Sequence, residues 1–143
     1  MCIQNDAELR FINNSSSGDE EKRKLLGSNI LMIGGGNTFD LLNRLKKSGL
    51  IETIKQFCNK ENYIAAGFSA GALVLSPNIQ VCNYHTLDEN LCSLSELDSI
   101  GAVDFELFVH FHDDLQTKLE TYRAITGNDV RSISDNDFIV VDK

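Results

Sequence analysis

The residue most able to do chemistry is a serine within residues 67–71, which read Gly-Phe-Ser-Ala-Gly. One apolar run, residues 63–66, precedes this motif, and a second, residues 72–75, follows it. This order predicts a strand, a sharp turn that carries Ser69, and a helix. Such a turn holds a hydroxyl clear of its backbone at a strained φ/ψ, and the start of the helix directs N–H groups at developing negative charge. The pattern indicates that Ser69 is a nucleophile.

A serine nucleophile needs a base that takes its proton and an acid that orients the base. The chain has three histidines. We favour His110 as the base, because it ends the strand-like segment 102–111 and active sites gather at the carboxyl ends of parallel strands. His112 shares its face if the strand continues. His85 lies in a segment without periodicity and is harder to place.

The orienting acid should also follow a strand, and Asp135 follows the one expected at residues 131–134. The competing carboxylates are those of Asp104, Asp113 and Asp137. With Asp135, the residues run in the order Ser, His, Asp, whereas the α/β-hydrolases run Ser, Asp, His. An esterase or amidase of the α/β-hydrolase type therefore stays as an alternative. Its acid would be one of Asp88, Asp98 and Asp104.

Residues 34–37, which read Gly-Gly-Gly-Asn, form a second backbone cradle after the strand expected at residues 29–33. An oxyanion hole usually needs two N–H donors, and Ala70 and Gly36 are placed to supply them. A phosphate-binding loop is the competing interpretation, but neither G-x-x-x-x-G-K-[ST] nor G-x-G-x-x-G is present. A tight turn that binds nothing is the simplest alternative.

Residues 110–114, which read His-Phe-His-Asp-Asp, also raise the question of a metal site. Two histidines spaced two apart on a strand can ligate one ion, and carboxylates follow closely. A polar surface loop explains the same residues more simply. We therefore expect neither a metal nor another cofactor.

The elements that must position these residues alternate between strands and helices along a single domain, residues 1–143. This alternation predicts an α/β fold whose parallel sheet is covered on both sides. Residues 14–18 are expected to be a mobile loop, and residues 78–101 a long loop or short irregular elements. Strands are expected at residues 8–13, 29–33, 63–66, 102–111, 131–134 and 138–141. Helices are expected at residues 19–26, 38–47, 50–57, 72–75 and 115–125.

Composition excludes several classes of function. The chain carries 21 acidic and 13 basic side chains, for a net charge of -8, which argues against a general nucleic-acid binder or a binder of anionic membranes. No apolar run approaches the roughly 20 residues of a membrane span, and the first residues do not look like a signal peptide. The four cysteines form no C-x-x-C pair, so reduced thiols in a cytoplasmic protein are expected.

Four blocks, at residues 33–39, 67–71, 109–111 and 134–136, resemble in order and spacing the dipeptidase E (aspartyl dipeptidase) family of serine peptidases. Cyanophycinase is a more distant relative. The resemblance covers roughly residues 25–143. It implies a fold akin to class I glutamine amidotransferase domains, a three-layer sandwich around a parallel sheet, with serine in place of the usual cysteine.

The resemblance also implies a triad of Ser69, His110 and an acid. That acid is glutamate in the enteric enzymes, but members that resemble this chain more closely place an aspartate there, which points to Asp135. The implied substrate is a small peptide, and the implied reaction releases an N-terminal aspartate through an acyl-enzyme that water hydrolyses. The resemblance places oxyanion and substrate contacts at Gly35, Gly36, Asn37, Ala70 and Asn83.

Three features depart from the family pattern. Asn83 and Tyr84 stand where the enteric enzymes have an Asn-Asp pair near the substrate, which leaves the preference for aspartate open. Val109 stands where the family has proline. The chain also looks short at both ends, so we expect a fragment, a trimmed domain, or a domain that a second copy completes as a homodimer. A truncated relative that binds a peptide or partner in the same cleft without catalysis is the alternative function.

Overall fold

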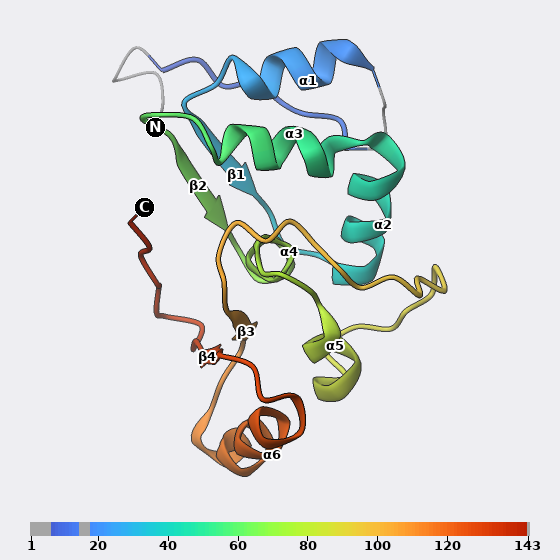
Figure 1. Cartoon of the computed structure of the whole chain (residues 1–143), viewed down its shortest axis with the longest axis vertical. Helices are drawn as coiled ribbons and strands as arrows, with labels where there is room; N and C mark the ends of the chain where they lie inside the picture. The colour runs from blue at the N-terminus through green and yellow to red at the C-terminus, as the bar shows by residue number, and fades with distance from the viewer. Residues whose placement is uncertain (1–6, 15–17, 143) are drawn as a thin grey trace.

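The computed structural model describes residues 7–14 and 18–142, and it has the α/β class that the sequence predicts. Helices and parallel strands alternate along the chain (Figure 1). A short 3-10 turn, Asp113–Leu115, leads into the last helix. The elements are α1 (Asp19–Leu26), β1 (Ile30–Ile33), α2 (Thr38–Ser48), α3 (Leu50–Phe57), β2 (Ile64–Gly67), α4 (Ala70–Leu75), α5 (Gln80–His85), β3 (Glu106–Phe108), α6 (Gln116–Thr126) and β4 (Val130–Ser132).

The strands form two parallel pairs. Ile30 of β1 lies opposite Ile64 of β2, and Glu106 of β3 lies opposite Val130 of β4. This differs from the single parallel sheet that we expected, because no ladder joins the two pairs among the described residues. Strands pair only where their backbones come within about 4.8 Å. Here α4 contacts β1, β2 and β3, so side-chain packing of this helix connects the pairs instead (Figure 1).

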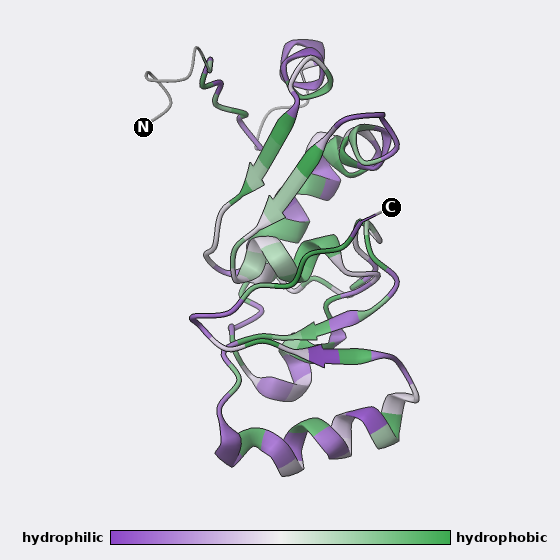
Figure 2. Ribbon diagram, turned by 90° about the vertical axis from the view of Figure 1, so that its left-hand side faces the viewer, coloured by the Kyte–Doolittle hydropathy of each residue, from purple (hydrophilic) through white to green (hydrophobic). Residues whose placement is uncertain are grey.

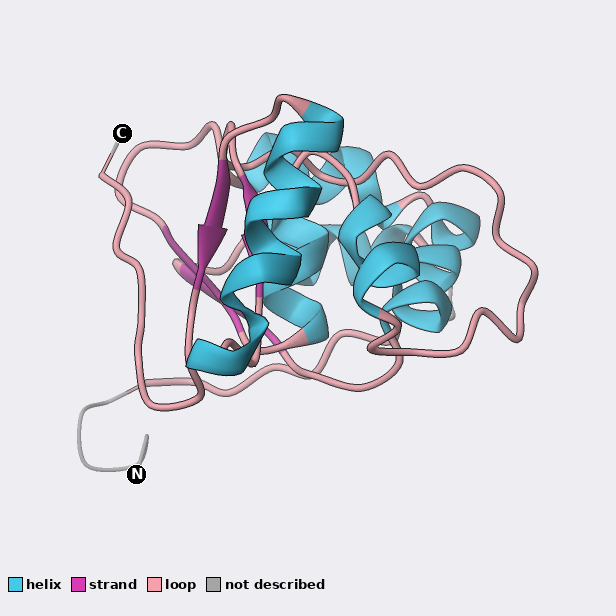
Figure 3. Cartoon of the chain, turned by 90° about the horizontal axis from the view of Figure 1, so that it is seen from below, coloured by secondary structure: helices cyan, strands magenta, loops and turns pink. Residues whose placement is uncertain are grey.

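Amphipathic helices cover one face of the first pair. In α2 the side chains of Phe39, Leu42 and Leu45 recur at helical spacing and are buried. Gly49 ends α2 at a φ of 71°, a left-handed conformation that glycine adopts without steric cost. The next helix, α3, then packs against α2 and α1. In Figure 3 the strands lie toward one side of the molecule and most helices toward the other.

The other face of the first pair is apolar and exposed. The side chains of Ile30, Met32 and Ile64 are 58%, 65% and 59% exposed, whereas Ile33 on the opposite face is buried. Figure 2 shows both strands in the colour of hydrophobic residues. The expected cover on both sides is therefore absent from the part of the chain that the structure describes.

Several predicted elements are corrected. Residues 8–13 and 138–141 form no strand, because neither segment finds a partner edge among the described residues, and Phe11 and Phe138 are largely exposed. Within residues 102–111 only β3 is a strand. Residues 78–101 contain a helix, α5, which at six residues is too short to show a period in the sequence. Of the loop expected to be mobile, residues 15–17 lie outside the described residues. No described helix combines the length and the apolar character that a membrane span requires.

Candidate active site

Ser69 occupies the sharp turn that joins β2 to α4. Its φ of 51° and ψ of -115° lie outside the regions that ordinary residues prefer. A conformation of this kind costs on the order of 1–3 kcal/mol and persists where the surroundings hold it. The amide of Phe68 donates to Ile33 O at 3.0 Å, and the amide of Gly71 donates to Phe68 O at 2.9 Å. These bonds fix the turn on both sides of the serine.

The two glycines of the motif allow the turn to press against β1 and α4. A Cβ placed on Gly71 would lie 2.6 Å from the carbonyl carbon of Ile33. A Cβ placed on Gly67 would lie 2.6 Å from Ala72 Cα. Both neighbours are backbone atoms, so neither can move aside cheaply. These two positions therefore require glycine, as the strand-turn-helix interpretation expects.

Ser69, His110 and Asp135 form one hydrogen-bonded chain. Ser69 Oγ lies 3.0 Å from His110 Nε2, and Asp135 Oδ1 is hydrogen-bonded to His110 Nδ1. A carboxylate only accepts, so Nδ1 donates to Asp135, and Nε2 of the neutral ring then accepts from the hydroxyl of Ser69. The proton on the serine is thus directed at the nitrogen that a general base would use.

Parallel pairing brings the histidine and the aspartate together. His110 follows the end of β3 by two residues, and Asp135 follows the end of β4 by three. The ladder continues beyond both strands, because Ile133 N donates to Phe108 O at 3.0 Å and Phe111 N donates to Ile133 O at 3.1 Å. His110 itself has a φ of 55°, so both Ser69 and His110 are held in the left-handed region. The side chains of His110 and Asp135 are about half exposed.

The glycine loop lies beside the nucleophile. A Cβ placed on Gly35 would lie 3.4 Å from Ser69 Cβ and 3.9 Å from Ser69 Oγ. Gly36 has a φ of 134°, and a Cβ placed on it would have no neighbour within 4 Å. Within the described residues, the amides of Gly36 and Ala70 donate no hydrogen bond to another backbone carbonyl. Ala70 directly follows Ser69 in the chain, and Gly36 directly follows Gly35, which lies beside Ser69. The two N–H groups expected to form the oxyanion hole are therefore free of backbone acceptors in the described part of the chain.

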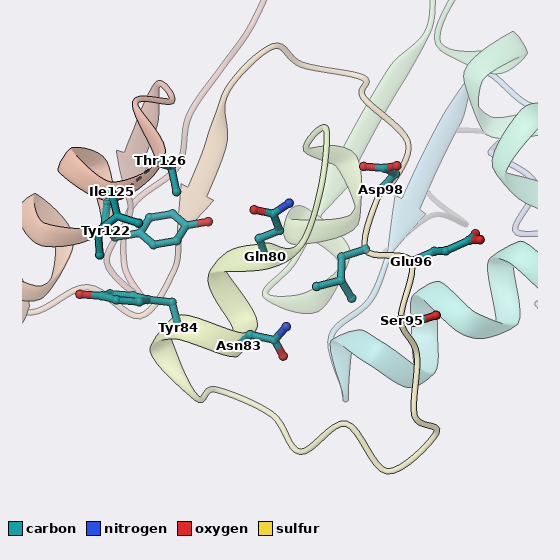
Figure 4. Close-up of a pocket in the computed structure, with 10 residues that line it drawn as sticks. Gln80, Asn83, Tyr84, Ser95, Glu96, Asp98, Tyr122, Ile125 and Thr126 are labelled. Carbon is teal, nitrogen blue, oxygen red and sulfur yellow. Dashed lines mark hydrogen bonds between the residues drawn. The ribbon is translucent and has the colours of Figure 1, made fainter.

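The remaining predicted substrate residues lie elsewhere. Asn37 caps α2 by accepting from Asp40 N at 3.0 Å, and its amide donates to Glu89 O at 2.9 Å. Asn83 lines an open groove of about 730 Å³ with Tyr84 and Asp98 (Figure 4). Ser69, His110 and Asp135 do not line that groove. The structure thus brings the glycine loop to the serine, whereas the side chain of Asn37 caps α2 and that of Asn83 lines the groove.

The residues that compete with Asp135 and His110 for the roles of acid and base have other surroundings. Asp137 accepts from Ser134 Oγ at 2.7 Å, and Asp88 accepts from Thr38. His112 is exposed.

Among residues 7–14 and 18–142, no three His, Cys, Asp or Glu side chains converge as ligands for a metal ion. The contact between Asp88 and Thr38, which are 50 residues apart, was missed from the sequence because no local pattern signals it.

His85 packs against the end of β3 and should make the stability of the protein depend on pH. Its ring stacks on Phe108 with 4.2 Å between centroids. Burial lowers the pKa of His85, and the charges of Lys118 and His110 lower it further. The unfolded chain therefore binds the proton more readily. Stability from this group is fully present above about pH 6.5 and falls as the pH drops through the lower folded pKa.

The measurement is urea unfolding of His85→Gln and of wild type between pH 5 and 8. The variant should lose part of the decrease in unfolding free energy that acid causes in wild type. His112→Gln, which removes an exposed imidazole, is the matched control. Equal pH slopes for wild type and His85→Gln would contradict the prediction.

An α/β fold with a hydrogen-bonded Ser-His-Asp chain at the carboxyl ends of its strands is typical of hydrolases with a serine nucleophile. Comparison with known proteins narrows this class. The model of peptidase family S51 matches residues 4–143, so the chain belongs to that family.

Relatives and a solved structure agree with this assignment. An uncharacterized peptidase of Listeria monocytogenes is 33% identical over 91 residues, covering 63% of this chain and 43% of that protein. Peptidase E of Salmonella arizonae is 32% identical over 88 residues, covering 62% of this chain and 36% of that protein. The crystal structure of a "putative Peptidase E protein" from Listeria monocytogenes superposes with a TM-score of 0.68 at 27% identity, covering 87% of this chain and 61% of that one. The chain thus spans less than half the length of these two curated relatives.

Proposed function

We propose that this chain is the catalytic part of a serine peptidase that hydrolyses small peptides through an acyl-enzyme on Ser69. The hydrogen-bonded chain of Ser69, His110 and Asp135 carries the proposal, because it supplies a nucleophile, a base and an orienting acid in one line. Membership of a peptidase family supports the choice of an amide bond as the target.

The geometry suggests the following sequence of steps. His110 Nε2 takes the proton of Ser69 as Oγ attacks the peptide carbonyl, and Asp135 stabilises the imidazolium that forms. The amides of Gly36 and Ala70 donate to the oxyanion. His110 then returns the proton to the leaving amine, and a water molecule, activated by the same ring, hydrolyses the acyl-enzyme.

The proposal also covers which N-terminal side chain of the substrate the enzyme prefers. The resemblance to dipeptidase E implies release of an N-terminal aspartate, and relatives named Peptidase E support testing it first. Tyr84 gives a reason to test other residues as well, since it replaces the aspartate of the enteric pattern. The ring of Tyr84 packs against Tyr122, with 4.9 Å between centroids.

The test is hydrolysis of a panel of Xaa-Leu dipeptides, Asp-Leu included, by wild type and by Ser69→Ala. Cleavage of Asp-Leu by wild type alone supports both the serine mechanism and the aspartyl preference. Cleavage of other dipeptides retains the mechanism and discards the preference. A folded wild-type chain that binds peptides without cleaving them would favour the alternative, a non-catalytic peptide-binding relative.

We expect Asp135→Asn to lower kcat by about 10²- to 10⁴-fold, because an amide does not hold the imidazole in the required tautomer or stabilise its charged form. KM should change little, since Asp135 contacts His110 rather than the substrate. Steady-state kinetics on the best dipeptide of the panel measures this. Asp137→Asn is the matched control, because Asp137 accepts from Ser134, three residues earlier in the chain, and is not hydrogen-bonded to His110. Equal activities of the two variants would remove Asp135 from the triad.

We further propose that the two parallel pairs belong to one three-layer sandwich of the class I glutamine amidotransferase type. The triad supports this, because residues after β2, β3 and β4 meet at the carboxyl ends of all three strands. The cytoplasmic location stays a prediction from the cysteine pattern.

A further inference from the structure

Asp88 joins the segment after α5 to the first residue of α2. Its Oδ2 accepts two hydrogen bonds from Thr38, one from the amide at 2.8 Å and one from the hydroxyl at 2.6 Å. The residue before Thr38 and the residue after Asp88 add a further hydrogen bond, since Asn37 Nδ2 donates to Glu89 O at 2.9 Å. These three hydrogen bonds link segments that are about 50 residues apart in the chain.

The position of this link matters because the glycine loop ends there. Residues 34–36 span the short distance between β1 and Asn37, and Gly35 lies beside Ser69. At the β1 end the loop is anchored where Phe68 N donates to Ile33 O. At the α2 end the anchor is Thr38 on Asp88. A displacement of Thr38 would therefore move the amide of Gly36 relative to Ser69.

Three features of the surroundings favour the hydrogen bonds between Asp88 and Thr38. Thr38 is 1% exposed, so water cannot readily replace a lost acceptor. The segment that carries Asp88 starts at Thr86, which has a φ of 54°. A β-branched residue rarely adopts this conformation, and such a residue persists where neighbouring contacts hold it in place. The carboxylate also faces the N-terminus of an 11-residue helix, where negative charge is favourable.

We propose that Asp88 is a positioning residue, which sets the oxyanion loop by holding Thr38 at the start of α2. The proposal rests on the proposed serine peptidase function. Asp88 acts through Thr38 and Gly36. Its loss should therefore weaken stabilisation of the tetrahedral intermediate and leave binding of the ground-state peptide largely intact.

The first test is the kinetics of Asp88→Ala and Asp88→Asn. We expect Asp88→Ala to lower kcat about 10- to 100-fold, as a misplaced oxyanion donor does, with KM within about twofold of wild type. Asp88→Asn keeps a side-chain oxygen that can accept both bonds from Thr38, so it should recover most of the activity. Asp40→Ala is the matched control, because it removes a carboxylate from the first turn of α2 that pairs with Arg44 and not with Thr38.

The second test uses a milder variant and a transition-state analogue. Thr38→Val removes the hydroxyl that donates to Asp88 and keeps the shape of the side chain, so it can be used if Asp88→Ala does not fold. Thr38→Ser restores the hydroxyl. A peptide aldehyde places an oxygen in the oxyanion hole after addition of Ser69. The inhibition constant of the aldehyde should rise in Asp88→Ala and Thr38→Val by the same factor by which kcat/KM falls. The KM of the peptide substrate should stay constant.

The outcomes separate this inference from the function on which it rests. A wild-type chain that cleaves no peptide and does not bind the aldehyde would overturn the proposed function. An active wild type with unchanged kcat in both Asp88→Ala and Thr38→Val would overturn the role of Asp88 alone. So would a fall in kcat that is matched by a rise in KM, or that follows only the unfolded fraction seen by circular dichroism.

Discussion

Replacement of Ser69 by alanine is expected to lower kcat/KM at least about 10⁴-fold, the size of effect that removal of a triad nucleophile has in other serine hydrolases. The reason is that no other hydroxyl in the described part of the chain is hydrogen-bonded to His110. The fold should survive, because Ser69→Ala leaves the backbone contacts of the turn in place. Steady-state hydrolysis of the best dipeptide and a thermal melt of each protein measure the two effects.

Ser93→Ala is the matched control for this experiment. Ser93 is also a serine at positive φ, 52°, but it lies in the loop after α5, where its amide donates to Asn90 O at 3.2 Å, and it is not part of the hydrogen-bonded triad. It should keep wild-type activity. Turnover by Ser69→Ala at more than a few per cent of the wild-type rate would end the assignment of Ser69 as nucleophile.

Replacement of Gly71 by alanine is expected to lower the free energy of unfolding by about 3 kcal/mol or more, as strongly overpacked sites do. The added Cβ would lie 2.6 Å from Ile33 C and 2.7 Å from Gly34 O. Relief requires α4 to move away from β1, which would also displace Ser69 from His110. Urea unfolding gives the change in stability, and the same samples should show loss of peptide hydrolysis.

Gly34→Ala tests whether the effect depends on packing at this particular position. A Cβ on Gly34 has no neighbour within 4 Å, and the residue is exposed. Its unfolding free energy should stay within about 1 kcal/mol of wild type. If Gly34→Ala were the more damaging of the two variants, the close approach of α4 to β1 would be wrong.

Local patterns predicted the elements that depend on local interactions. The helical spacing of apolar residues in α2 and α3 predicted both helices, because an amphipathic stripe is readable over a dozen residues. The strand-turn-helix around Ser69 was predicted because its glycines and flanking apolar runs lie within one short segment. The wrong strands, at residues 8–13 and 138–141, show the limit of this reasoning, since a strand also requires a partner edge elsewhere in the chain.

The sequence by itself therefore determined the α/β class, the turn that carries Ser69, and the residue types available for a triad. Asp135 was already the favoured acid, but only the tertiary structure brings its carboxylate into a hydrogen bond with His110, since the extended pairing of β3 with β4 sets which carboxylate reaches the ring. The tertiary structure likewise decided that Asp88 holds Thr38 across 50 residues. The physical reason is that hydrogen bonds between distant segments depend on strand register and helix packing, which no local pattern encodes.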